Sequence, residues 1–206
     1  STDQMLDTPT SNFATLNPND STGVAGNFTV LEGNLGFTVD NNSFYRNVSS
    51  TFFPEGLKGY YEYRVNVGTP NFFIGMYPDN LAPSSSSYTV STTIYLRNSG
   101  ALSSGTTTLK SGMTPAFSTG DVGMVAFDFT GSNRYIWFGR NGTWGVDQSG
   151  NQQDPSTGTN PAFTFTSEQQ LYFASNSGSG TQTIVVNFGQ DSTFAGATTA
   201  GGNADV

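Results

Sequence analysis

The side chains that could carry chemistry in this chain are aromatic, amide and carboxylate groups, because its 206 residues include no histidine and no cysteine. The sequence therefore lacks the usual zinc ligands, the usual base of a serine triad and any thiolate nucleophile. A retaining glycosidase would need two carboxylates about 5 to 5.5 Å apart. The chain has no Glu-x-Asp-x-x-Glu strand, and its glutamates are Glu32, Glu55, Glu62 and Glu168. We predict that the protein is not an enzyme and keep glycosidase activity as a remote alternative.

Four aspartates have structural interpretations. Asp121 is typical of a turn, and Asp128 is typical of a hydrogen-bonded residue at the end of a strand. Asp147 and Asp154 belong to a long polar loop over residues 147–161, where calcium is an open alternative because hard cations need only oxygen ligands. No loop has a known calcium-binding spacing, so we predict a solvated acidic loop, with no metal and no cofactor.

Aromatic and arginine side chains are the best candidates for ligand contacts, because such residues dominate binding hot spots. Trp144 follows Asn141-Gly142, a dipeptide typical of tight turns with positive φ. Trp137 lies in an alternating segment and is predicted to be core, whereas Trp144 either anchors a ligand or covers the rim of the core. The predicted ligand-binding set is Trp144, Tyr95, Arg97 and Gln148, in which a sugar would stack on the Trp144 indole beside the Gln148 amide.

The elements that must position these residues are predicted to be strands. The chain contains 17 Phe, 9 Tyr and 25 Gly, and only 11% of its residues are charged. This composition is typical of short strands joined by tight turns, and it leaves little material for the charged face of a surface helix. Strand patterns recur along the chain without a helical pattern of 10 to 15 residues. We predict an all-β fold with two packed antiparallel sheets and about ten strands or more.

Alternation predicts which side chains face the core. Residues 60–67 place Tyr61, Tyr63, Val65 and Val67 on one face, and Glu62 and Arg64 as neighbours on the other, where an ion pair is expected. Residues 88–96 are predicted to be one strand. The residues predicted to point inward are Tyr61, Tyr63, Val125, Phe127, Val186 and Phe188.

The net charge limits the partners that we expect, and the composition of the two ends indicates how the chain is organised. A net charge of -8 disfavours phosphate backbones, and no apolar run reaches the length of a membrane-spanning helix. We therefore expect neither nucleic-acid binding nor membrane insertion. Composition divides the chain into an extended N-terminal arm over residues 1–27, a β-sandwich over residues 28–196 and a C-terminal tail over residues 197–206. An arm of that length spans about 90 Å when extended, enough to reach a neighbouring subunit.

Three blocks of the predicted sandwich carry distinctive motifs: Lys58–Val65; Gly120–Phe129 with Tyr135–Phe138 and Arg140–Gly142; and Val186–Gln190 with Phe194. They resemble SPRY domains, which have a concanavalin A-like jelly-roll fold. The blocks resemble, in order, the family's "K-W-Y-W-E-V-x-V" strand, its "G-D-V-I-G-V-A-L-D" strand with the "F-x-K-N-G" hairpin, and its closing "V-N-F-G-Q…F". Arg140 stands where the family usually has lysine, and residues 171–174 replace its "Y-P-A-V" strand.

The resemblance implies a binding role without catalysis, since loops at one end of the SPRY sandwich bind partner proteins. The Asn- and Thr-rich start over Leu6–Pro18, and the Asn141–Trp144 hairpin leading into Thr157–Phe163, look like SPRY-like modules of marine (cyano)phage structural proteins. This resemblance implies a virion structural protein at the virion surface, either a capsid decoration protein or a tail or fibre component. The expected partners are other virion proteins or copies of the chain in a homo-oligomer, and a host-surface glycan or protein. The alternative is a lectin-like module of a bacterial surface protein.

Overall fold

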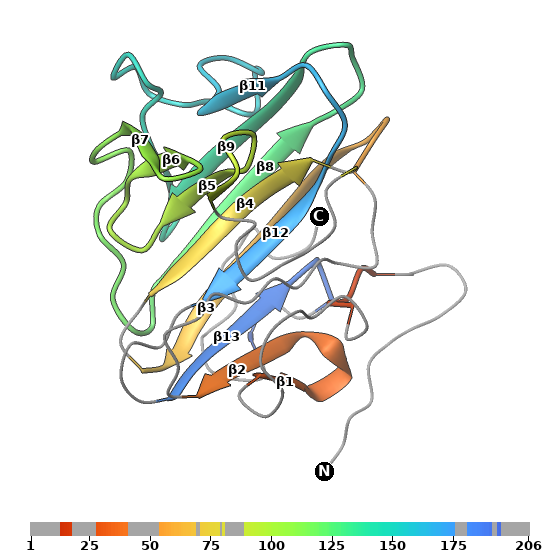
Figure 1. Cartoon of the computed structure of the whole chain (residues 1–206), viewed down its shortest axis with the longest axis vertical. Helices are drawn as coiled ribbons and strands as arrows, with labels where there is room; N and C mark the ends of the chain where they lie inside the picture. Colours follow the sequence, from red (N-terminus) through yellow and green to blue (C-terminus); the bar gives the residue numbers. More distant parts are fainter. Residues whose placement is uncertain are drawn as a thin grey trace.

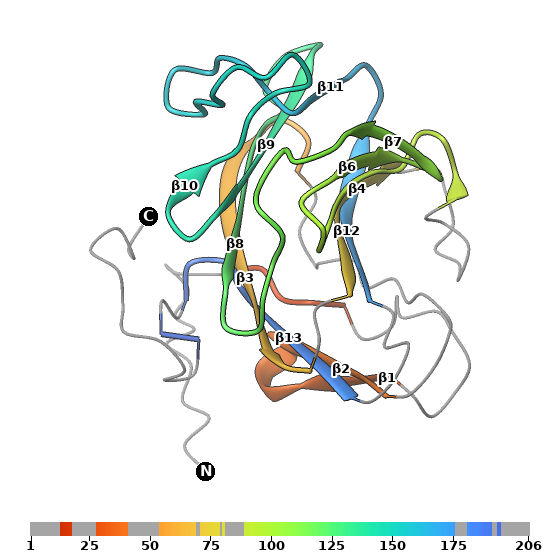
Figure 2. The same ribbon diagram turned by 90° about the vertical axis from the view of Figure 1, so that its left-hand side faces the viewer.

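Two antiparallel sheets face each other in the computed structural model, which describes residues 13–17, 28–40, 54–68, 71–78, 80, 89–175, 181–190 and 193–194 (Figures 1 and 2). The larger sheet has the order β1 (Phe28–Leu31), β2 (Gly36–Asp40), β13 (Thr181–Asn187), β3 (Lys58–Val67), β8 (Val122–Asp128), β9 (Arg134–Arg140) and β10 (Thr143–Trp144). An eighth strand, β11 (Phe163–Phe165), pairs with β9. The smaller sheet has the order β12 (Gln169–Ser175), β4 (Phe72–Pro78), β5 (Ile94–Arg97), β6 (Leu102–Ser104) and β7 (Thr107–Lys110). The predicted all-β sandwich is confirmed.

Helix is nearly absent from the described part of the chain. It is limited to 3-10 positions: Thr89 and η2 (Glu32–Asn34), a 3-10 turn that joins β1 to β2 in the predicted hairpin. None of the helices in that part is long and apolar enough to cross a membrane.

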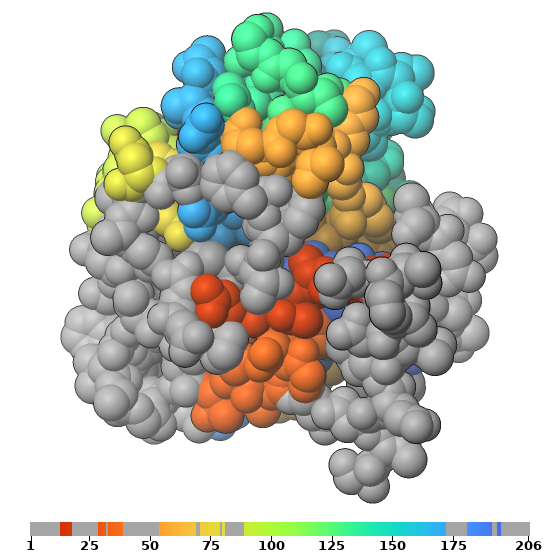
Figure 3. Space-filling view, turned by 90° about the vertical axis from the view of Figure 1, so that its right-hand side faces the viewer, coloured from red at the N-terminus to blue at the C-terminus, as the bar shows by residue number. Residues whose placement is uncertain are grey.

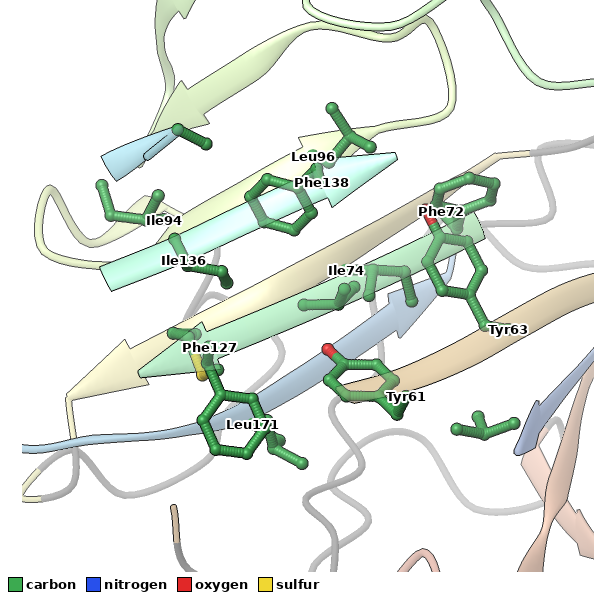
Figure 4. Close-up of a cluster of buried hydrophobic side chains, with 14 of the residues drawn as sticks. Tyr61, Tyr63, Phe72, Ile74, Ile94, Leu96, Phe127, Ile136, Phe138 and Leu171 are labelled. Atoms are coloured by element: carbon green, nitrogen blue, oxygen red, sulfur yellow. The ribbon is translucent and has the colours of Figure 1, made fainter. Parts of the chain in front are cut away.

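The core lies between the two sheets and consists mainly of aromatic and branched side chains. Alternate residues of β3, β8 and β9 point toward alternate residues of β4 and β5, as Figure 4 shows for Tyr61, Phe138, Ile74 and Leu96. Of the six residues predicted to point inward, five are buried in this core, and Phe188 is half-buried against it. Strand alternation predicted these positions because successive side chains leave a strand on opposite faces.

Glycines on β3 and β8 make room for large aromatic rings on the partner strand. Gly59 pairs with Phe127 and Tyr63 pairs with Gly123, so that each strand supplies one glycine and one ring. A Cβ atom at Gly59 would lie 2.3 Å from Phe127 Cζ, and one at Gly123 would lie 2.0 Å from Tyr63 Cζ. Both rings therefore lie directly over a glycine backbone. This reciprocal arrangement fixes the register of the two central strands.

Three local predictions are wrong. Val67 is 52% exposed although it alternates with buried residues, because it lies at the end of β3 where the pairing with β13 shifts register. Glu62 and Arg64 form no ion pair: Glu62 accepts a hydrogen bond from Tyr60, and Arg64 donates to Asn66 Oδ1 and to the Gly120 carbonyl. The strand predicted over residues 88–96 begins only at Ile94, and residues 90–92 form turns and bends.

Part of the predicted N-terminal arm contacts the sandwich. Leu16 is buried, and its N–H donates to the Asn34 carbonyl at 2.7 Å. Figure 3 shows residues 13–17, in red, against the β1–β2 hairpin, in orange. The side chain of Gln190 also donates to the Ala14 carbonyl. The rest of the arm and the tail over residues 197–206 lie outside the described residues, so the three-part division of the chain stays a prediction.

Candidate ligand-binding site

The β9–β10 hairpin is held in one conformation by its turn residues. Asn141 and Gly142 both have positive φ, at 49° and 78°, which the predicted Asn-Gly turn requires. Asn141 Oδ1 accepts the Val122 N–H at 2.8 Å, and the Asn141 N–H donates to the Val122 carbonyl at the same distance. These bonds tie the turn to the start of β8, so the residues that follow it have a defined position.

Asp121 joins this turn to the adjacent loop. Its Oδ2 accepts Nε and Nη2 of Arg140 at 2.9 and 2.7 Å and the Ser118 N–H at 2.6 Å, and its Oδ1 accepts the Asn141 amide at 2.7 Å. Desolvation tends to raise the pKa of Asp121, but the hydrogen bonds from Asn141, Ser118 and Arg140 outweigh it and lower that pKa. Asp121 is thus a turn residue, as predicted, and a carboxylate held in its charged form.

The two tryptophans have different environments. Trp137 is 1% exposed and donates its indole N–H to the Thr159 carbonyl at 2.8 Å, so the loop after β10 covers it on the outer face of the sheet. Trp144 is half-buried. Its indole lies over Gly139, where a Cβ atom would be 3.1 Å from Trp144 Cε3. Its ring also meets the ring of Tyr60 edge-on, with centroids 6.1 Å apart.

Beside Trp144 lies an open groove with a volume of about 600 Å³. The β9–β10 hairpin and the loop over residues 112–115 form its walls. Met113, Pro115 and Val146 contribute apolar surface, and Arg140 and Thr143 contribute polar groups. The complete lining is Gly112, Met113, Thr114, Pro115, Arg140, Asn141, Thr143, Trp144, Gly145 and Val146.

Side-chain amides stabilise the loop that follows the groove. Gln153 Oε1 accepts the buried Phe138 N–H at 2.8 Å, and Gln153 Nε2 donates to the Val146 carbonyl at 2.7 Å. Asp147 accepts hydrogen bonds from Asn151, and Asp154 accepts bonds from the two residues that follow Pro155. Desolvation tends to raise the pKa of Asp147, but its hydrogen bonds outweigh it and lower that pKa, and the bonds from Ser156 and Thr157 lower the pKa of Asp154. Across the described ranges, no cluster of three or more acidic side chains has a geometry that could hold a metal ion.

The structure does not bring the four predicted ligand-binding residues together. Trp144 belongs to the larger sheet, whereas Tyr95 and Arg97 belong to the smaller one. Tyr95 is fully buried, stacks on Phe73 at 4.6 Å and donates its hydroxyl to the Gly105 carbonyl, so its ring cannot contact a ligand at the surface. Arg97 lies over both rings, 5.5 and 5.7 Å from their centroids. Gln148 donates to the Ala162 carbonyl at 3.1 Å. Ligand binding by Trp144, Arg97 and Gln148 stays a prediction.

Sequence reasoning missed Tyr60 as a neighbour of Trp144, Glu62 as the hydrogen-bond partner of Tyr60, and Arg140 as a residue of the groove. Tyr60 and Glu62 were placed only on the face of β3 that points away from the core. The signal that could have identified the neighbourhood is the pair of small residues Ala126 and Gly139, because small side chains on an outer face leave space for large rings above them.

The chain has the SPRY-type, concanavalin A-like β-sandwich fold, and three solved structures bear this out. It aligns with the SPRY domain of human HERC1 at a TM-score of 0.59 and 14% identity, over 85% of this chain and 99% of that one. A second human SPRY domain gives 0.59 and 10% identity, over 79% of this chain and 96% of that one. The PSpry domain of TRIM65 gives 0.53 and 10% identity, over 85% and 92%. No protein-family model and no curated protein matches the sequence.

Proposed function

We propose that the chain is a non-enzymatic binding module of a virion structural protein and that the groove beside Trp144 holds a segment of a partner protein. The observation that carries this proposal is the combination of a half-buried tryptophan with a groove whose walls are already fixed by the Asp121 network. Aromatic anchors in preformed pockets contribute most of the binding energy at protein interfaces. Preorganised walls also reduce the entropy lost on binding.

The described carboxylates support binding over catalysis. Three of them form ion pairs: Glu55 with Arg134, Asp121 with Arg140 and Asp128 with Lys58, each at 2.7 Å. Glu62 accepts a hydrogen bond from the Tyr60 hydroxyl, so its partner is not the second carboxyl group that a glycosidase needs. Desolvation tends to raise the pKa of Asp121 and of Asp128, but the hydrogen bonds to their carboxylates outweigh it and lower both, whereas a general acid needs a raised pKa. These groups are therefore suited to holding loops and strands in place.

The proposed setting is the surface of a bacteriophage particle, where the partners are other virion proteins or further copies of the chain. The phage-like sequence segments and the acidic, thiol-free composition support this setting. The alternative is a lectin-like module that binds a glycan or protein at a bacterial surface, and the half-buried Trp144 favours it equally, since a sugar could stack on the indole.

Particle incorporation tests the proposal. Trp144→Ala should reduce incorporation or partner binding by about 30-fold or more, as expected for a hot spot of about 2 kcal/mol. Tyr135→Ala is the matched control, because Tyr135 is a half-buried ring of the same sheet that does not line the groove. Cross-linking of native particles should place partner residues beside Trp144. Equal incorporation of both variants would refute the groove, and binding only to a glycan array would favour the lectin-like alternative.

The predicted arm offers a second test of the setting. Deleting residues 1–12 should leave the sandwich folded and abolish assembly, because an arm that packs on a neighbour is ordered only where contacts compensate its entropy. Deleting residues 1–27 also removes buried Leu16, so a loss of assembly in that variant could reflect a loss of stability. Normal incorporation of the shorter deletion would exclude a role of these residues in assembly.

A further inference from the structure

The rings of Tyr60 and Trp144 form a corner on the outer face of the larger sheet. Their centroids are 6.1 Å apart and their planes make an angle of 75°, so one ring meets the other edge-on and the two rings stand as nearly perpendicular walls. Both side chains are half-buried. Perpendicular aromatic walls are the arrangement that binds organic cations, because each face presents the negative side of its quadrupole.

The register of the sheet explains why these two rings meet. Tyr60 pairs with Ala126 of β8, and Trp144 pairs with Gly139 of β9, which in turn pairs with Met124. Ala126 and Gly139 have little or no side chain, so nothing projects between the rings at these positions. Met124 and Ala126 are only 7% and 8% exposed although neither belongs to the core cluster. They therefore form the floor of the corner.

A carboxylate adjoins the same corner. Tyr60 donates its hydroxyl to Glu62 Oε1 at 2.5 Å, which ties the carboxylate to the edge of one wall. Burial, followed by the Glu62 hydrogen bond and its charge, raises the pKa of Tyr60 well above its ordinary value, so this hydroxyl remains a donor. Among the described residues, no lysine or arginine forms an ion pair with Glu62. Arg64, its neighbour on the same face, donates instead to Asn66 and to the Gly120 carbonyl.

We infer that Tyr60, Trp144 and Glu62 form a binding site for an organic cation, supplied by a lysine or arginine side chain of the partner. The rings attract the cation through their faces, and Glu62 supplies the negative charge that no cation of the described chain neutralises. The net charge of -8 favours approach of a basic partner over long range. This inference rests on the proposed function in one respect, since Trp144 lines both the groove and the corner.

The test uses choline as the cation and 3,3-dimethylbutan-1-ol as its uncharged isostere. Both probes have the same shape, so any difference in binding to the full chain reports the charge. Ring currents should shift the methyl protons of bound choline upfield in NMR titrations, and we expect choline to bind about tenfold more tightly than the isostere. N-acetyl-lysine methylamide should compete with choline.

Variants assign the effect to the corner. Glu62→Gln keeps the size of the side chain and should reduce the preference for choline by several-fold, and Trp144→Leu should abolish the upfield shift. Tyr135→Leu is the matched control, because this half-buried ring of the same sheet lies beside Trp137 and should leave choline binding unchanged. If Trp144→Leu lowers the melting temperature, Glu62→Gln alone still tests the charge.

Equal affinity for choline and its isostere would overturn the inference, as would a preference for choline that survives both corner variants. Binding of a neutral sugar without choline binding would likewise overturn it and favour the glycan alternative. The proposed function fails separately, if Trp144→Ala leaves partner binding unchanged. Partner binding that depends on Trp144 but not on Glu62 would retain the groove and remove the cation site.

Discussion

The reciprocal packing of rings on glycines predicts strong coupling between Gly59 and Phe127. A Cβ atom at Gly59 would lie 2.3 Å from Phe127 Cζ and 2.7 Å from Cε1, so Gly59→Ala forces the ring or the strand to move. Overpacking of this kind costs about 1 to 3 kcal/mol. Replacing glycine within a strand stabilises by about 0.5 to 1 kcal/mol, so the net destabilisation of the single variant should lie between about 0 and 2.5 kcal/mol.

Phe127→Ala should destabilise the fold by about 3 to 5 kcal/mol, because the ring is 4% exposed and lies edge-on to Phe129 at 5.6 Å. Once that ring is removed, the methyl group of Gly59→Ala occupies space that the ring vacated. The second substitution should then be neutral or stabilising. The double-mutant cycle should give a favourable coupling of about 1 to 3 kcal/mol.

Urea denaturation followed by far-UV circular dichroism measures each free energy of unfolding, and equal m-values confirm comparable transitions. Gly131→Ala is the matched control, since the nearest atom to its new Cβ would be Asn133 O at 3.6 Å and the change should stay within about 0.5 kcal/mol. Additivity of the two substitutions within about 0.5 kcal/mol would refute the packing argument. A loss below about 1 kcal/mol for Phe127→Ala would refute the assignment of its face.

The remaining predictions concern the half-buried ring of Phe188, the loss of stability at low pH and the helix content of the protein. Phe188→Ala should cost less than Phe127→Ala, because Phe188 is only half-buried, and parallel urea titrations compare the two. The folded pKa of Asp121 is lowered, so its contribution is present above the unfolded pKa of about 3.9 and is lost as the pH falls through the folded value. Asp121→Asn should therefore lower the melting temperature at pH 7, and the difference from the unsubstituted chain should shrink toward pH 3; a constant difference would contradict this linkage. Far-UV circular dichroism should show less than about a tenth helix, and substantial helix would exclude the fold.

Much of the fold could be predicted from the sequence because strand geometry is local. Side chains alternate with period two along a strand, so the spacing of Tyr61, Tyr63 and Val65 identifies a buried face without knowledge of its partner. The Asn141-Gly142 turn was equally predictable, since its positive φ values suit those residue types. The three motif blocks indicated the sandwich class, and the two antiparallel sheets of the structure confirm it.

Pairings between distant segments could not be predicted in this way. Arg134 bonds to Glu55, which lies 79 residues earlier in the chain, because the fold brings the start of β9 beside the loop before β3. Val67 is exposed because β13 shifts register beside it, and nothing in the alternation of β3 shows where the partner strand slips.

The candidate site shows the same division. The sequence by itself determined that Trp144 follows a tight turn and that Tyr60 and Glu62 share one face of a strand, since both facts depend on neighbours along the chain. Only the tertiary structure decided that Tyr95 is buried on the other sheet and that Trp144 meets Tyr60 across Gly139 and Ala126. The physical reason is that hydrogen-bonded register sets which side chains lie side by side, and register depends on strands that are far apart in the sequence.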